Sequence, residues 1–115
     1  MTQKVVETSK GMITVFDEIE PPIGNVSDFL DIIANTAGEA FAVTKESLSH
    51  DFYDLKTRLA GELLQKVSTY NKHMIILGDF STITSKSLRD FIYESNKTGE
   101  IVFASSLDDG VCKLR

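Results

Sequence analysis

Apolar side chains recur every three or four residues along residues 52–70, and this spacing predicts the longest helix of the chain. The apolar stripe of that helix consists of Phe52, Leu55, Leu59, Leu63, Val67 and Tyr70. The other side is charged, with Arg58 and Glu62, and then Glu62 and Lys66, at the i,i+4 spacing that lets opposite charges attract. A helix with one apolar stripe needs a surface to pack on. The neighbouring apolar runs are expected to supply that surface as a sheet.

Five short runs predict the strands of this sheet. Residues 4–8 and 12–16 favour β-structure and are separated by Ser9, Lys10 and Gly11, a loop that fits an antiparallel hairpin. Residues 74–77 are apolar throughout, which is typical of a strand buried on both faces. The remaining two strands are expected at residues 39–43, where the sequence is rich in alanine, and at residues 101–104.

Capping residues predict three further helices. The first begins after Asn25 and ends before Gly38, with its apolar face on Val26, Phe29, Leu30 and Ile33. Another begins after Thr84 or Ser85 and stops at residues 97–99, with a stripe on Leu88, Phe91, Ile92 and Ser95. A short last helix follows Ser105 or Ser106, with Asp108 and Asp109 in its first turn and with Gly110 weakening it.

The resulting order is β-β-α-β-α-β-α-β-α, which predicts a single α/β domain. Strands that alternate with helices are joined by right-handed crossovers, so the sheet is expected to be mixed: an antiparallel hairpin followed by largely parallel strands. The length of 115 residues is that of one domain.

Composition excludes several classes of function. Twelve Lys and Arg against seventeen Asp and Glu give a formal charge of −5, which argues against nucleic-acid binding and against adhesion to an anionic membrane. The one cysteine, Cys112, cannot form an intramolecular disulfide or a cysteine-based zinc site. The chain lacks an apolar run of the roughly 18 residues that a membrane span requires, and it lacks a signal-peptide core. We therefore expect a cytoplasmic protein.

Polar residues that could bind a ligand follow the carboxyl ends of the predicted parallel strands, which is where ligands of open α/β sheets bind. The polar residues there are Lys45, Glu46, Asp54, Lys56 and Thr57, then Asp79, Ser81, Thr82, Thr84, Ser85, Lys86 and Ser87, and finally Ser105 and Ser106. Hydroxyls and lysines at helix starts can bind a small anion, but Ser, Thr and Asp are also the ordinary cap residues.

Known cofactor signatures are absent from the sequence. The phosphate-loop, dinucleotide and zinc-protease motifs do not occur, so no cofactor is expected. His50, Asp51, Asp54 and Asp79 have no helical ligand spacing, which disfavours a metal site.

Two resemblances follow from particular motifs. The segments at residues 52–57, 59–62, 78–80 and 84–94 are similar to those of an uncharacterised bacterial family of small proteins, catalogued as a domain of unknown function. This resemblance covers nearly the whole chain and implies no activity. More distantly, the element order resembles the STAS domain of anti-sigma factor antagonists and sulfate transporters.

The STAS resemblance implies a phosphoswitch at Thr57. In that family a turn of sequence Asp-Ser-Ser-Gly-Leu-Gly opens the second helix, and its second serine is phosphorylated to change partner binding. Thr57 would take the place of that serine, although Arg58 stands where the family has glycine and an extra residue follows Asp54. Without this role, Thr57 would be a capping hydroxyl.

The leading hypothesis from the sequence is a regulatory, protein-binding domain without catalytic activity. Its candidate binding surface comprises Asp54, Lys56, Arg58, Glu62, Asp79, Ser85, Lys86, Ser87 and Arg89, and phosphate on Thr57 or a bound anion would change the affinity for a partner. The alternative is a small enzyme for an anionic metabolite, in which Lys56, Lys86 and Arg89 hold the anion and Asp54 or Asp79 acts as base. The oligomeric state stays open.

Overall fold

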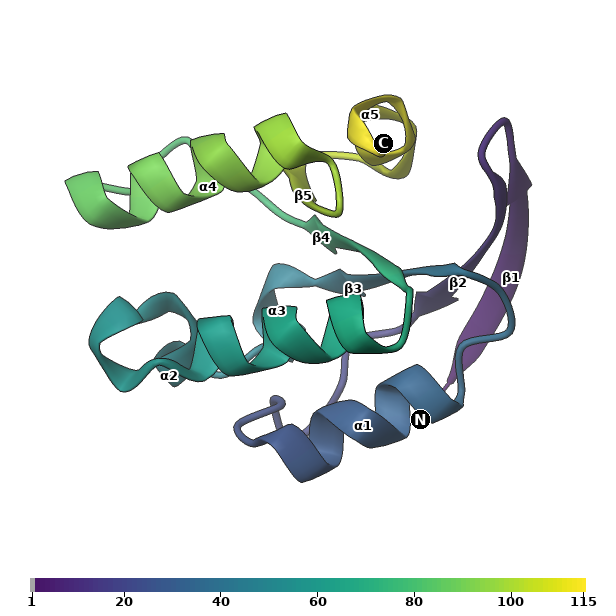
Figure 1. Ribbon diagram of the computed structural model, residues 1–115, viewed down its shortest axis with the longest axis horizontal. Helices are drawn as coiled ribbons and strands as arrows, with labels where there is room; N and C mark the ends of the chain where they lie inside the picture. The colour runs from purple at the N-terminus through teal and green to yellow at the C-terminus, as the bar shows by residue number, and fades with distance from the viewer. Residues whose placement is uncertain (1) are drawn as a thin grey trace.

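The computed structural model describes residues 2–115. Its strands form one five-stranded sheet in the order β1-β2-β3-β4-β5 (Figure 1). The strands are β1 (Gln3–Thr8), β2 (Gly11–Phe16), β3 (Ala40–Thr44), β4 (His73–Leu77) and β5 (Ile101–Ala104). The first two pair antiparallel, and each later strand is parallel to its neighbour. The predicted α/β class, with an N-terminal hairpin and a largely parallel remainder, is confirmed. The alanine-rich third strand also forms, displaced by one residue from its predicted position.

The helices lie on both faces of the sheet. They include α1 (Val26–Ala34), α3 (Leu59–Thr69), α4 (Lys86–Thr98) and α5 (Leu107–Lys113). Figure 1 shows α1, α3 and α4 in a row, with α5 set apart from them. Right-handed crossovers between adjacent parallel strands place the connecting helices on one face. Because α5 follows the last strand, it is free to cover the other face.

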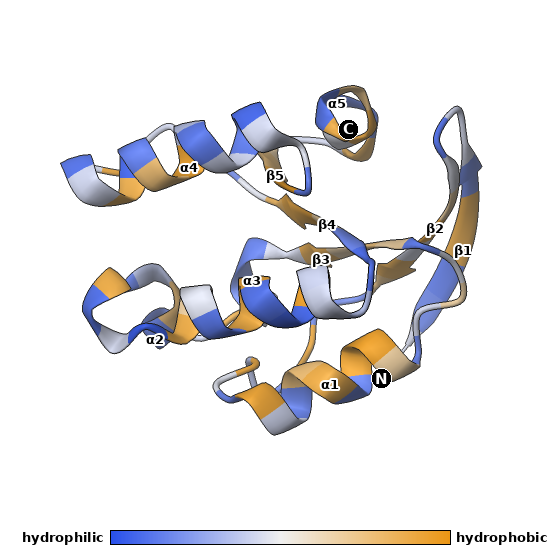
Figure 2. Cartoon of the chain, viewed as in Figure 1, coloured by the Kyte–Doolittle hydropathy of each residue, from blue (hydrophilic) through white to orange (hydrophobic). Residues whose placement is uncertain are grey.

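Each face of the sheet has its own apolar core. The larger core joins α1 and α3 to the strands through side chains that include Phe16, Phe29, Phe41, Leu63, Val67 and Ile76. The smaller core joins α5 to the strands through Ile13, Ala40, Ala42, Ile75, Val102, Ala104, Val111 and Leu114. Figure 2 shows hydrophobic colour along β4 and β5 and on α1, whereas polar residues dominate the outer side of α4. The central strands are therefore buried on both faces, as their apolar sequences predict.

The predicted helix over residues 52–70 is wrong as a continuous element. The chain instead forms α2 (His50–Tyr53), a 3₁₀ turn η2 (Leu55–Thr57) and then α3. Arg58 separates the last two pieces and has a left-handed backbone with φ of 67°. Local hydrogen bonds compete with the helix here, because the carboxylate of Asp54 accepts from the N–H of Lys56 and the Thr57 hydroxyl donates to two carbonyls.

This break changes the surface of the predicted helix. Tyr70 lies beyond the end of α3 and is 51% exposed, so it does not belong to the buried stripe. Within residues 2–115, neither Arg58 with Glu62 nor Glu62 with Lys66 forms the expected ion pair.

The other long helices begin at the predicted caps. Asn25 caps α1 by accepting from the N–H of Asp28 at 2.8 Å, but the helix ends at Ala34 rather than near Gly38. Ser85 caps α4, Gly99 closes it with φ of 78°, and Ser106 caps α5. Across residues 2–115, none of the helices is long and apolar enough to cross a membrane.

Candidate functional site

The carboxyl ends of the parallel strands carry two grooves. The first lies between the α2–η2 segment and the start of α4, and it has a volume of about 350 Å³. Its walls are Tyr53, Asp54, Leu55, Lys56, Ser85 and Ser87. The second lies beside the ends of β4 and β5 and has a volume of about 510 Å³. We refer to them as the η2–α4 groove and the β4–β5 groove.

The η2 turn fixes the backbone of Lys56 at the η2–α4 groove. Asp54 accepts from the backbone N–H of Lys56 at 3.2 Å. The hydroxyl of Thr57 donates to the carbonyls of Asp51 and Asp54 at 2.6 and 2.9 Å, and accepts from the N–H of Leu59 at 3.3 Å. Thr57 therefore fastens η2 to the start of α3. Among the described residues, the ammonium group of Lys56 has no hydrogen-bond or ion-pair partner.

The other wall of this groove is the first turn of α4. The hydroxyl of Ser85 accepts from the N–H of Leu88 at 3.2 Å, and the carbonyl of Ser85 accepts from the N–H of Arg89 at 3.0 Å. The N–H groups of Lys86 and Ser87 belong to the first turn and have no acceptor within residues 2–115. Free N–H groups and the helix dipole favour negative charge at this position.

Tyr53 is an uncharged wall of the same groove. Its hydroxyl donates to the carbonyl of Lys45 at 2.8 Å, and its ring packs edge-on against Phe52 with the centroids 5.0 Å apart. Burial raises the pKa of Tyr53, and the nearby charge of Glu46 raises it further. The tyrosine is therefore neutral throughout the physiological range.

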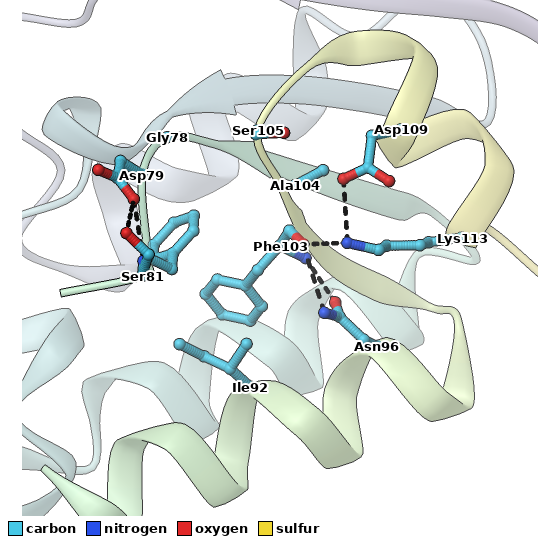
Figure 3. Close-up of a pocket in the computed structure, with 11 residues that line it drawn as sticks. Gly78, Asp79, Ser81, Ile92, Asn96, Phe103, Ala104, Ser105, Asp109 and Lys113 are labelled. Atoms are coloured by element: carbon cyan, nitrogen blue, oxygen red, sulfur yellow. Dashed lines mark hydrogen bonds and ion pairs between the residues drawn. The ribbon is translucent and has the colours of Figure 1, made fainter. Parts of the chain in front are cut away.

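Asp79 lines the β4–β5 groove, but its carboxylate already accepts hydrogen bonds within the turn after β4 (Figure 3). It accepts from the hydroxyl of Ser81 at 2.6 Å and from the N–H of Ser81 at 2.9 Å. These hydrogen bonds, together with the positive charge of Lys45, lower the pKa of Asp79. The next residue, Phe80, packs edge-on against Phe103 at 5.2 Å between centroids. Asp79 is thus held in its ionised form as part of the turn after β4.

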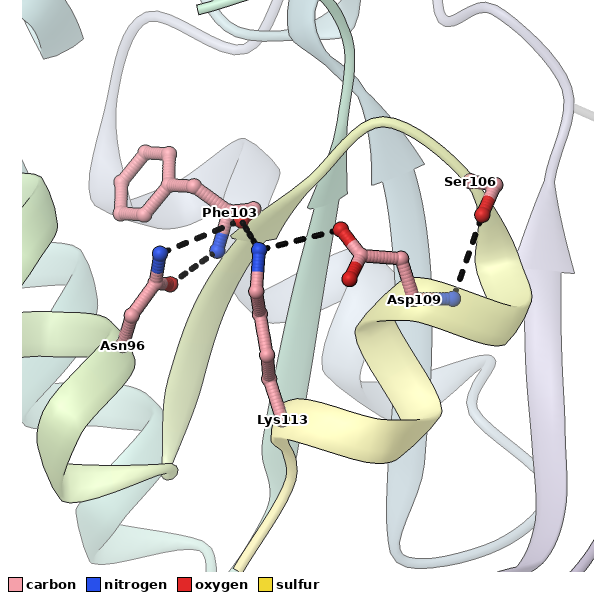
Figure 4. A network of polar contacts seen from close by, with 5 residues as sticks. All are labelled: Asn96, Phe103, Ser106, Asp109 and Lys113. Carbon is pink, nitrogen blue, oxygen red and sulfur yellow. Dashed lines mark hydrogen bonds and ion pairs between the residues drawn. The ribbon is translucent and has the colours of Figure 1, made fainter.

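The far side of the β4–β5 groove is closed by a polar network (Figure 4). Lys113 pairs with Asp109 at 3.0 Å, which lowers the pKa of Asp109, and Lys113 also donates to the carbonyl of Phe103 at 3.3 Å. The amide of Asn96 accepts from the N–H of Phe103 at 2.7 Å and donates to its carbonyl at 3.3 Å. The charged groups of this groove therefore already have partners.

The structure brings some of the predicted site residues together and separates others. Asp54, Lys56, Ser85 and Ser87 line one groove, although about 30 residues separate the two pairs in the sequence. Asp79 lies in the other groove. Lys86 turns away to pair with Asp90 at 2.7 Å, which raises the pKa of Lys86.

Three other predicted residues lie outside the η2–α4 groove: Arg58, Glu62 and Arg89. Sequence reasoning missed Tyr53 and Asn96, because their roles depend on hydrogen bonds to distant backbone groups that leave no local pattern. In residues 2–115 no three His, Cys, Asp or Glu side chains are grouped closely enough to hold a metal ion.

The protein is thus a small α/β domain with a mixed five-stranded sheet and two grooves at the carboxyl ends of its parallel strands. The chain belongs to the family described as Domain of unknown function (DUF4180), whose model matches residues 8–114. No curated protein and no solved structure matches the chain. The resemblance to the uncharacterised family is confirmed. The comparisons do not support the resemblance to STAS domains, which rests on the element order and on the motif around Thr57.

Proposed function

We propose that this protein is a binding domain that recognises an acidic or phosphorylated side chain of a partner protein in the η2–α4 groove. The observation that carries the proposal is that Lys56, whose ammonium group has no partner among the described residues, lines the same groove as the start of α4, where the first N–H groups are free. Such groups bind carboxylates and phosphates.

The character of the groove favours a side chain presented by a protein. Lys56, Ser85 and Ser87 line the open site. The half-buried ring of Tyr53 and the side chain of Leu55 offer apolar contact beside them. A partner residue that carries an anionic group on an apolar stem matches this combination. The carboxylate of Asp54 opposes a second negative charge, so it restricts where the anionic group can lie.

Phosphorylation of Thr57 would regulate this site. The modification replaces the hydroxyl proton that binds the carbonyls of Asp51 and Asp54, so it loosens the η2 turn. It also adds nearly two negative charges next to Lys56. Both effects lower the affinity of the groove for an anionic partner.

An NMR titration tests the proposal with the N-acetyl amide of phosphoserine as the probe. We expect the largest shifts at the backbone amides of Lys56, Lys86 and Ser87. Changing Lys56→Gln should weaken binding several-fold, because it removes the one cation of the groove. The matched control is Lys97→Gln, because Lys97 lies at the end of α4 that is remote from the groove. Equal affinity in the wild type and in Lys56→Gln would contradict the proposal.

The native mass of the endogenous protein, isolated gently from its source cells, tests whether the chain binds a partner or carries phosphate in the cell. A co-purified protein, or one phosphate mapping to Thr57, would support partner binding under phosphorylation control. An unmodified chain carrying a small anionic metabolite would support the alternative, in which the same groove serves a ligand or substrate.

A further inference from the structure

The outer edge of β1 has unpaired backbone groups. Asp17 donates its N–H to the carbonyl of Thr2 at 2.9 Å, which identifies this pair as hydrogen-bonded. Hydrogen-bonded pairs alternate along an antiparallel ladder. The register therefore directs the N–H and C=O groups of Gln3, Val5 and Glu7 away from β2. Since β1 is the first strand in the sheet order, these groups face outward, and Figure 1 shows the strand at the margin of the molecule.

The opposite edge of the sheet is closed. Side chains occupy the backbone groups of β5, with the amide of Asn96 on both polar groups of Phe103 and the hydroxyl of Ser95 on the carbonyl of Ile101. Lys113 adds a second donor to the carbonyl of Phe103. An exposed strand edge is a template for pairing, and proteins commonly cover it. In this chain the cover is present at β5, whereas β1 lacks one within residues 2–115.

We propose that the edge of β1 binds the β1 strand of a second copy of this chain, so that two sheets join into one of ten strands. Antiparallel pairing about a two-fold axis at Val5 places each outward-facing residue opposite another outward-facing residue. Val5 then faces its own counterpart, and Gln3 faces Glu7 of the second copy. This register forms up to six backbone hydrogen bonds, two for each facing pair.

The side chains of β1 fit this register. Val5 is 48% exposed, and the pairing covers it with an identical apolar side chain. Lys4 faces the half-buried Val6 of the second copy, whereas a shift of the register by one residue on each strand would set Lys4 against Lys4. Like charges directly opposite each other destabilise a sheet. The register centred on Val5 thus avoids the like-charge pair of the register centred on Lys4.

The closed edge at β5 limits the assembly to two copies. A two-fold contact uses the same patch on both partners and closes on itself. Because the only open edge among the described strands is consumed in the contact, the sheet does not extend into a filament.

The molar mass in solution tests the proposal, measured by light scattering after size exclusion. We expect the wild type to have twice the mass of the chain. Val5→Lys should give a folded monomer whose thermal stability does not depend on protein concentration, because the side chain is exposed on the isolated subunit and meets its own charge in the dimer. The control Met12→Lys changes a residue on the same face with 52% exposure but on β2, so the dimer should persist. A monomeric wild type, or a dimeric Val5→Lys, would overturn the proposal.

Hydrogen exchange distinguishes this interface from any other dimer contact. The amides of Gln3, Val5 and Glu7 should exchange more slowly as protein concentration rises. The alternate amides of Lys4 and Val6 are already bonded to β2 and should not respond. Rapid exchange at Val5 in a sample that is fully dimeric would show that the copies associate elsewhere.

Discussion

Asn96 on α4 replaces a missing neighbour strand at the edge of β5, and its removal should be costly. Its side chain satisfies both the N–H and the C=O of Phe103, a residue that is only 2% exposed. In Asn96→Ala the carbonyl retains Lys113 at 3.3 Å, so only the N–H loses its partner. Leaving one buried donor unsatisfied costs about 1–3 kcal/mol. Alanine recovers about 0.5 kcal/mol through its higher helix propensity.

A second substitution separates the two hydrogen bonds. Asn96→Asp keeps an acceptor for the N–H of Phe103 but sets a carboxylate oxygen against its carbonyl, an unfavourable contact that the neighbouring ammonium of Lys113 offsets in part. We expect this variant to lose about 1 kcal/mol or less. The exposed neighbour Lys97 provides the control, because Lys97→Ala should change stability by no more than about 0.5 kcal/mol.

Urea unfolding at neutral pH measures these differences, and hydrogen exchange at the Phe103 amide locates them. Exchange should accelerate in Asn96→Ala and stay slow in Asn96→Asp. The reasoning is refuted if Asn96→Ala unfolds at the same urea concentration as Lys97→Ala. It is also refuted if the Phe103 amide exchanges as fast in Asn96→Asp as in Asn96→Ala, since the side-chain oxygen would then not protect the N–H.

Further predictions concern other parts of the molecule. Gly110→Ala should destabilise by about 1–3 kcal/mol, because the new Cβ would lie 2.6 Å from Cγ2 of Ile75. Gly61→Ala should stabilise the protein by about 0.5–1 kcal/mol, because Gly61 lies in a helix and the new Cβ would have no atom within 4 Å. Thermal unfolding should show a lower melting temperature for Gly110→Ala and a higher one for Gly61→Ala. The raised pKa of Tyr53 means that the unfolded chain ionises first, so stability should fall above a pH of about 10, and Tyr53→Phe should reduce that fall in alkaline urea titrations. The lowered pKa of Asp79 gives a stabilising contribution that is present above a pH of about 4 and lost as the pH falls further; a steeper acid loss in Asp79→Asn than in the wild type would contradict this.

The strands and most helix starts could be predicted because local sequence determines them. The apolar run at residues 74–77 can only be buried on both faces, and Asn25 can only cap the helix that follows it. The alanine-rich strand β3 could also be predicted, because it lies between β2 and β4 in the sheet and a strand in that position accepts small side chains. In each case the local preference and the tertiary structure agree.

The break at Arg58 could not be predicted from periodicity. The stripe of residues 52–67 keeps its helical spacing across the interruption, so pattern reasoning sees one helix. The helix is interrupted because the short polar side chains of Asp54 and Thr57 form hydrogen bonds with the backbone and stabilise the η2 turn. Arg58 then adopts a left-handed conformation that glycine would adopt more readily.

The candidate groove was predictable in outline and not in detail. The rule that ligands bind at the carboxyl edge of parallel strands indicates the loops that carry Lys56 and Ser87. The rule does not show that Lys86 pairs with Asp90 while Lys56 stays unpaired. It also does not separate Asp79 from Asp54 into different grooves, since that separation depends on where η2 and α4 meet.

The two proposals together predict bivalent binding. The two-fold axis of an antiparallel strand pair stands perpendicular to the sheet, so both copies of α4 lie on the same face and the two η2–α4 grooves lie at opposite ends of the joined sheet. A ligand that carries two phosphoserines on a linker long enough to span the grooves should bind more tightly than one phosphoserine, through effective concentration. Val5→Lys should abolish this gain and leave the affinity for one phosphoserine unchanged. Lys56→Gln should weaken both ligands. A bivalent gain that persists in monomeric Val5→Lys would show that it has another source.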